Sequence, residues 1–156
     1  VVLGGFYLGQ QKKTQNQPDQ LQNTVTPLLT PTPTNSPEKT GTIEGSLSFP
    51  SEGIPPDMIV CAETLGGQKV ACTDVHIKNP KYKYGEGYKL EVAAGQYYVY
   101  ANLPSSGPDR KAYYNEFVTC GLSVNCSSHK KIEVTIEAGK TTSGVDPHDW
   151  YDNSSP

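Results

Sequence analysis

The chain has 156 residues, which is enough for one ordinary domain and some additional segments. Its formal net charge is only −3, and acidic and basic residues are mixed along the chain. The chain therefore lacks the strongly basic stretches typical of proteins that bind nucleic acids, and no nucleic-acid partner is predicted. Fifteen glycines, 13 prolines and 10 tyrosines separate short apolar runs, a composition typical of a β-domain with many turns.

The chain begins with an apolar stretch and a polar one. Residues 1–9, "VVLGGFYLG", are uncharged but shorter than the roughly 20 residues that span a bilayer. We interpret them as the end of a transmembrane segment, with the end of a signal peptide as the alternative. Residues 10–40 are rich in Pro, Thr and Gln and predict a disordered linker with extended, polyproline-like parts. This order predicts a membrane-anchored, extracytoplasmic protein; an ordinary disordered tail is the alternative.

Residues 41–156 carry strand patterns. In "TIEGSLSF", one face holds Ile43, Gly45, Leu47 and Phe49, and the polar residues alternate with them. The same period of two occurs in "YKLEV" and "KIEVTIE", and further short runs are "DMIVCAET", "QKVACTDV", "QYYVYAN", "AYYNEFVT" and "TTSGV". About seven to eight short strands between turn residues predict an all-β antiparallel sandwich without a helix.

Three segments carry a family resemblance: "GTIEGSL" at 41–47, "GYKLEVAAGQYYVY" at 87–100 and "IEVTIEAGKTTSGVD" at 132–146. Together they resemble the prealbumin-like Greek-key sandwich of carboxypeptidase regulatory-like and Cna-B-like domains. The resemblance implies a non-catalytic extracellular module. We expect Gly95 to supply a positive φ in the turn before its strand, and Tyr97 and Val99 to face the core.

The segment "CAETLGGQKVAC" predicts a hairpin that turns at Gly66-Gly67. Counting back from this two-residue turn pairs Glu63 with Val70 and places Cys61 opposite Cys72, at a separation that a disulfide tolerates. The bridge is expected on the outer face of the sheet near Glu63 and Asp74. The core face would then hold Met58, Val60, Ala62, Ala71, Thr73 and Val75.

A second disulfide between Cys120 and Cys126 would close the loop "CGLSVNC". Four cysteines allow three pairings, so this assignment depends on the hairpin argument. Zinc sites usually space cysteine pairs by two to four residues, whereas ten and five residues intervene here, so a cysteine metal site is the disfavoured alternative. Two disulfides predict an oxidising compartment.

The C-terminal "GVDPHDWYD" concentrates acidic residues and a histidine around the single tryptophan. Asp146, His148 and Asp149 are the candidates for a divalent cation site, although no known loop spacing is present and no cofactor is predicted. A catalytic version would need them to converge with His76 or His129. Otherwise His129 is expected to be a bystander beside the second disulfide.

The strand "QYYVYAN" carries a second candidate site. Tyr98, Tyr100 and Asn102 alternate with the expected core residues and so would form an outward strip that could bind a glycan or a protein. The alternative is that these tyrosines only stabilise an exposed sheet.

The function predicted from these patterns is a non-enzymatic, membrane-tethered structural or binding module of the adhesion type. The first alternative is a metal-dependent enzyme or cation-binding module that uses the C-terminal cluster. The second is a carbohydrate-binding module that uses the surface tyrosines.

Overall fold

A computed structural model describes residues 39–107 and 110–152. The predicted anchor at 1–9 and nearly all of the predicted linker at 10–40 lie outside the described residues. The elements in chain order are β1 (Thr40–Ser46), β2 (Ile59–Thr64), β3 (Lys69–Thr73), β4 (Ile77–Lys78), β5 (Glu86–Ala93), β6 (Gly95–Asn102), the 3-10 turn η1 (Pro104–Ser106), β7 (Lys111–Tyr113), α1 (Glu116–Thr119), β8 (Val134–Ile136) and β9 (Thr141–Ser143).

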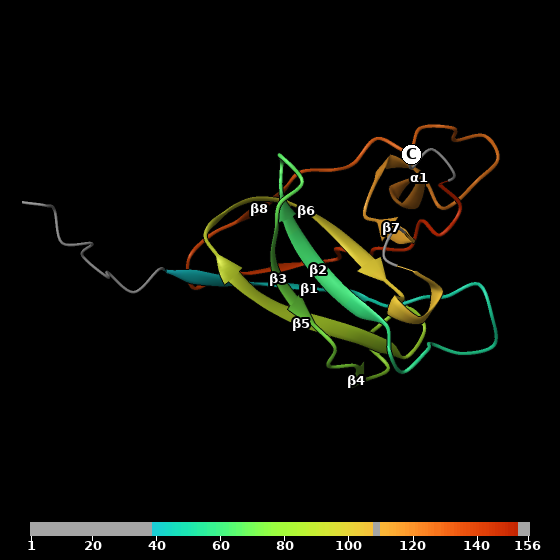
Figure 1. Ribbon diagram of the computed structural model, residues 1–156, viewed down its shortest axis with the longest axis horizontal. Helices are drawn as coiled ribbons and strands as arrows, with labels where there is room; N and C mark the ends of the chain where they lie inside the picture. Colours follow the sequence, from blue (N-terminus) through green and yellow to red (C-terminus); the bar gives the residue numbers. More distant parts are fainter. Residues whose placement is uncertain (1–38, 108–109, 153–156) are drawn as a thin grey trace, which may run out of the picture. The chain divides into compact units, whose positions relative to one another are not determined.

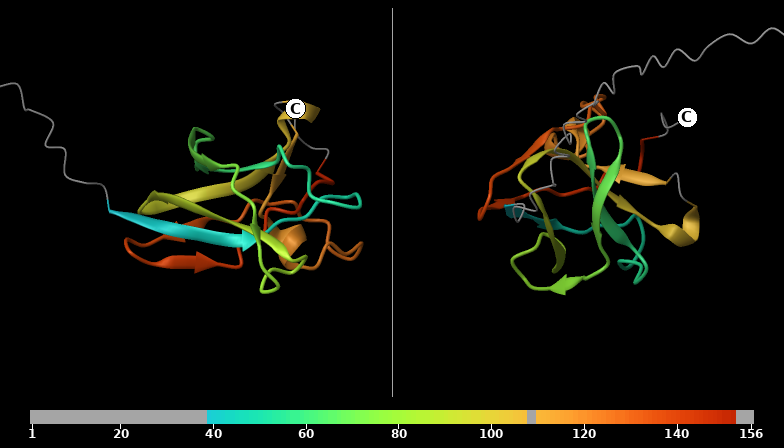
Figure 2. Two further views of the ribbon diagram at one scale, coloured as in Figure 1. Left: turned by 90° about the horizontal axis from the view of Figure 1, so that it is seen from below. Right: turned by 60° about the vertical axis from the view of Figure 1, so that its left-hand side comes forward.

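The strands form a two-layer sandwich, as the sequence predicted (Figure 1). One sheet has the order β4-β5-β1-β9, and the other has the order β3-β2-β6-β7, with β8 also paired to β6. One pair departs from the predicted antiparallel arrangement, because β1 and β9 run parallel, with Ile43 opposite Thr142 (Figure 2). A parallel pair is possible here because β1 and β9 are distant in sequence and no hairpin joins them.

The core between the sheets follows the predicted alternation. In β1, Ile43 is fully buried and Leu47 just beyond the strand is 1% exposed. In β6, Val99 and Ala101 face the same core, and Tyr97 joins them. The period-two pattern therefore predicted correctly which side chains of β1 and β6 are buried between the layers.

Gly95 has a different role from the one predicted. It begins β6 without a positive φ. A Cβ on Gly95 would lie 3.0 Å from the hydroxyl of Tyr97, which donates a hydrogen bond of 3.0 Å to the Ala93 carbonyl. The glycine therefore leaves room for the Tyr97 ring instead of forming a left-handed turn.

The Cys61–Cys72 disulfide is present, and the two residues face one another across β2 and β3. The turn, however, is wider than predicted: Glu63 pairs with Lys69, and Val70 is an extra residue that bulges from β3. The predicted core face of this hairpin included Val75, and that prediction is wrong. β3 ends at Thr73, and Val75 is 61% exposed.

The predicted strand "AYYNEFVT" is only partly a strand. After β7, the chain turns into the one-turn helix α1, where the Asn115 side chain accepts a hydrogen bond from the Val118 amide at 3.1 Å. This N-cap bond satisfies a backbone amide at the start of α1, so the chain can form a helical turn here instead of continuing as a strand. The Cys120–Cys126 disulfide then closes the loop that follows α1, as predicted.

Candidate functional site

The segment 145–152 closes one end of the sandwich beside β1. The Val145 amide donates to the Glu44 carbonyl at 3.1 Å, and the buried Tyr88 hydroxyl donates to the Val145 carbonyl at 2.8 Å. Further along, the Trp150 indole donates to the Ser48 carbonyl at 2.8 Å. These contacts hold the C-terminal acidic residues and histidine on a defined path, and Figure 1 shows this end of the chain beside α1 and β7.

Asp146 and His148 both turn toward Ser46. Asp146 Oδ1 accepts from the Ser46 amide at 2.7 Å, and His148 Nε2 donates to the Ser46 carbonyl at 2.8 Å. His148 is 2% exposed, and burial lowers its pKa against the opposing effects of the Ser46 bond and the Asp146 charge. The predicted cluster of Asp146, His148 and Asp149 therefore does not converge, because the first two anchor the segment to β1.

Asp149 faces a different group of residues. Its Oδ2 contacts His129 Nδ1 at 2.5 Å and accepts a hydrogen bond from the Asn115 amide at 2.5 Å. Its Oδ1 accepts from the Tyr151 amide at 3.2 Å. Asp149 is fully buried, whereas His129 retains 31% side-chain exposure. The carboxylate thus joins the helix cap, the loop before β8 and the C-terminal segment.

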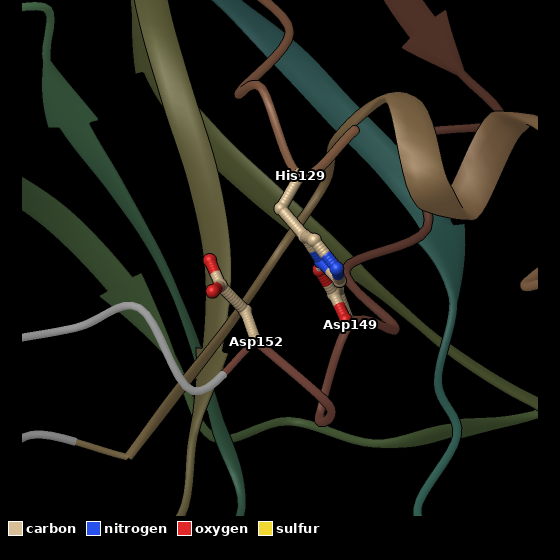
Figure 3. A group of neighbouring side chains, drawn as sticks. All are labelled: His129, Asp149 and Asp152. Atoms are coloured by element: carbon tan, nitrogen blue, oxygen red, sulfur yellow. Dashed lines mark hydrogen bonds and ion pairs between the residues drawn. The ribbon is translucent and has the colours of Figure 1, made fainter. Parts of the chain in front are cut away.

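Asp152 lies beside this pair, so that His129, Asp149 and Asp152 each offer a ligand atom within 4.8 Å of the others (Figure 3). His129 and Asp152 are partly exposed, and the Phe117 ring lies 4.7 Å from the His129 ring, centroid to centroid. We call these three residues the His129 cluster. A histidine and two carboxylates are the donor set of a divalent transition-metal site.

The sequence identified the His129 cluster only in part, because it named His129 as a partner of Asp149 only for the catalytic alternative and did not select Asp152. His129 was expected to be a bystander, and 20 residues separate it from Asp149. The contact depends on how the loop that contains the second disulfide folds against the C-terminal segment. His76, the other histidine considered, lies elsewhere: it contacts Glu86 at 2.9 Å and the Met58 carbonyl at 2.8 Å.

A cavity of about 520 Å³ opens on the same C-terminal segment. Its aromatic lining, which we call the aromatic cleft, consists of Phe49, Tyr84, Trp150 and Tyr151. Phe49 and Trp150 pack edge to face with ring centroids 5.1 Å apart, while Tyr84 and Tyr151 are each 55% exposed. Glu52 and Glu86 are also among the residues that line the cavity, and Glu86 contacts His76 through one carboxylate oxygen. The cleft thus combines apolar ring faces with polar groups, as small-molecule sites do.

The predicted outward strip on β6 is largely covered. Tyr100 is 4% exposed and Asn102 is 8% exposed, so only Tyr98 of the three remains partly accessible. Tyr100 packs with Cys61 and Tyr113 in a second cluster of buried residues, and the Asn102 amide donates to the Arg110 carbonyl at 3.1 Å. The face points away from the core as predicted, but β7 pairs beside β6 in the same sheet, and its Lys111 and Tyr113 side chains pack against Tyr100.

No protein-family model matches this chain, and no curated protein shows significant sequence similarity to it. No helix within residues 39–107 and 110–152 is long and apolar enough to cross a membrane.

A buried carboxylate, that of Glu63, lies on the outer face of the sheet that contains β2 and β6. Glu63 is 1% exposed and binds Lys111 at 3.0 Å, Lys131 at 3.3 Å and the Tyr113 hydroxyl, which donates at 2.8 Å. The Lys131 ammonium also lies 3.7 Å from the centre of the Tyr113 ring. Burial disfavours the charged form of Glu63, but the bonds and charges of Lys111, Tyr113 and Lys131 outweigh it, and the pKa of Glu63 lies below its ordinary value.

The Glu63 pKa predicts a loss of stability in acid. Because the native pKa is lower than the unfolded one, the contribution of Glu63 is complete above the unfolded pKa of about 4.3 and disappears as the pH falls through the native pKa. Glu63→Gln should therefore show a shallower decline in unfolding free energy than the wild type below that pH. Urea unfolding at pH values from 6 to 3 measures both slopes. Parallel profiles for the two proteins would contradict this prediction.

Proposed function

We propose that the chain is a non-enzymatic, membrane-tethered, extracytoplasmic binding module of the prealbumin-like type, and that the aromatic cleft binds a carbohydrate. Two disulfides in a small β-sandwich suit an oxidising compartment. The apolar stretch at 1–9 and the Pro-rich stretch at 10–40 support a tether to a membrane.

The observation that carries this proposal is the pair of exposed rings in the aromatic cleft. Tyr84 and Tyr151 each present about half of their surface to solvent beside the cavity, next to the packed pair of Phe49 and Trp150. A sugar ring offers an apolar C–H face that stacks on such rings. Its hydroxyl groups can donate to acceptors such as Glu52 and Glu86 at the same cavity.

The positions of the acidic residues favour a binding module over the metal-dependent enzyme. That enzyme needed Asp146, His148 and Asp149 to converge with a further histidine. Asp146 and His148 instead bond to Ser46, and Asp149 accepts three hydrogen-bond contacts that join separate segments. These side chains hold the C-terminal segment in place, and the segment in turn supplies Trp150 and Tyr151 to the cleft.

A glycan array probed with the full chain, followed by calorimetry on the best saccharide, tests the proposal. We expect saturable binding without turnover. Tyr84→Ala and Tyr151→Ala should each weaken it about tenfold, which corresponds to roughly 1.4 kcal/mol of stacking energy. Tyr98→Ala is the matched control on the outer face of β6, and it should leave the affinity unchanged. Absence of any saccharide ligand, or loss of binding in Tyr98→Ala alone, would refute the assignment to the cleft.

A further inference from the structure

Within residues 39–107 and 110–152, the buried Asp149 carboxylate of the His129 cluster forms no ion pair with a lysine or arginine. Asp149 is fully buried, and its one ion-pair partner in the described part of the chain is His129, which is charged only when protonated. Glu63, which is equally buried, binds two lysines. Buried charges in proteins are paired with opposite charges or coordinate metals. The contrast indicates that Asp149 is arranged for a cation that the described lysines and arginines do not provide.

We propose that His129, Asp149 and Asp152 bind a divalent transition-metal ion, with zinc preferred. The three ligand atoms already lie within 4.8 Å of one another, so a central ion could contact all three after small side-chain adjustments. They would supply one imidazole nitrogen and two carboxylate oxygens. Figure 3 shows His129 and Asp149 directed toward each other, with Asp152 beside them.

The surroundings of the cluster resemble a metal site's outer shell. The Asn115 amide donates to Asp149 Oδ2 and the Tyr151 amide donates to Oδ1, so the carboxylate is held in one orientation. The Asn115 side-chain oxygen is fixed in turn by the amide of Val118. His129 and Asp152 are partly exposed, which leaves an entry path and space for water ligands on one side.

The donor set selects the kind of ion. Calcium and magnesium prefer six or more oxygen ligands, whereas an imidazole nitrogen favours zinc and its first-row neighbours. Two carboxylates neutralise the charge of a dication, so no further anionic ligand is required. Because Asp149 and Asp152 flank Trp150 and Tyr151, a bound ion would also stabilise the segment that lines the aromatic cleft.

Calorimetry with zinc chloride on the full chain, stripped of metal with a chelator, tests the proposal. The wild type should bind one equivalent of zinc, and His129→Gln and Asp152→Asn should each weaken binding by about tenfold or more. These two residues are partly exposed, so their variants should fold, which circular dichroism verifies. Zinc should raise the thermal midpoint of the wild type but not that of His129→Gln.

Matched controls decide between this site and adventitious binding. His76→Gln removes a histidine, and Asp74→Asn an exposed carboxylate, at positions outside the cluster, and both variants should bind zinc as the wild type does. Calcium at the same concentration should give no comparable heat. Failure to bind one equivalent of zinc would overturn the proposal, as would unchanged affinity in His129→Gln. All of these results are independent of saccharide binding, so they stand whether or not the aromatic cleft binds a carbohydrate.

Discussion

Replacing both Lys111 and Lys131 by methionine is expected to lower the free energy of unfolding by about 3–5 kcal/mol. The Glu63 carboxylate lies 1% exposed beneath these two ammonium groups, and methionine keeps the length of each lysine stem but removes its charge. The buried carboxylate would then retain only the hydrogen bond from Tyr113. A buried charge that loses its partners is strongly destabilising, whereas an exposed ion pair contributes little. Urea unfolding at pH 7 measures the difference.

Adding Glu63→Gln to this double variant separates loss of charge pairing from loss of packing. Since glutamine is neutral, the triple variant should regain most of the lost stability. Methionine at Lys78 and Lys130, two exposed lysines without an ion pair in the described residues, is the control and should change stability by less than about 0.5 kcal/mol. A triple variant no more stable than the double would show that the lysine stems, and not their charges, stabilise the outer face.

Gly45→Ala is expected to destabilise the domain by about 3 kcal/mol or to shift the C-terminal segment. A Cβ at this position would overlap the backbone carbonyl of Val145 at well under 3.0 Å, a distance that real Cβ contacts do not show. The Val145 backbone cannot move cheaply, because it is bonded to Glu44 and to the Tyr88 hydroxyl. Denaturant unfolding measures the free energy of unfolding. Near-ultraviolet circular dichroism of Trp150 reports any movement of the C-terminal segment 145–152.

Gly53→Ala is the matched control for this substitution. Nothing lies within 4 Å of its added Cβ, and its φ is not positive, so the unfolding free energy should change by less than about 0.5 kcal/mol. Equal effects at the two glycines would indicate a general cost of losing backbone freedom, and not the close approach of β1 to Val145.

The hairpin shows why some of the fold was predictable. The Cys61–Cys72 pairing was derived from a two-residue turn, and the turn is in fact wider. The bulge at Val70 absorbs the extra residue before Ala62 meets Ala71, so the register at the cysteines is the one that the count gave. The alternation of apolar residues identified the core faces of β1 and β6 for the same reason. The count from the turn and the alternation each depend on only a few neighbouring residues of the chain.

The candidate sites depended on long-range packing, which alternation does not report. It placed Tyr100 and Asn102 on the outer side of β6 but did not indicate that the Lys111 and Tyr113 side chains of the neighbouring strand β7 would pack against Tyr100 on that side. The loop from Cys120 to Lys131 has no periodic pattern, so the sequence offered His129 and His76 as alternative partners of Asp149 but could not choose between them. The ion pair of the buried Asp149 with His129, and with no lysine of the described residues, becomes visible only in three dimensions.

The position of β1 has a mechanical consequence. β1 starts at Thr40, the last residue of the predicted linker, and lies between β5 and β9, with seven residue pairs to β5 and three to β9. Tension applied from the N-terminal side would pull along the strand, perpendicular to the hydrogen bonds of its antiparallel pair with β5 and across the slanted bonds of its parallel pair with β9. The bonds on both sides would then bear the load together instead of opening one after another. A domain held through this strand would resist extraction by force better than one held through a strand at the sheet edge.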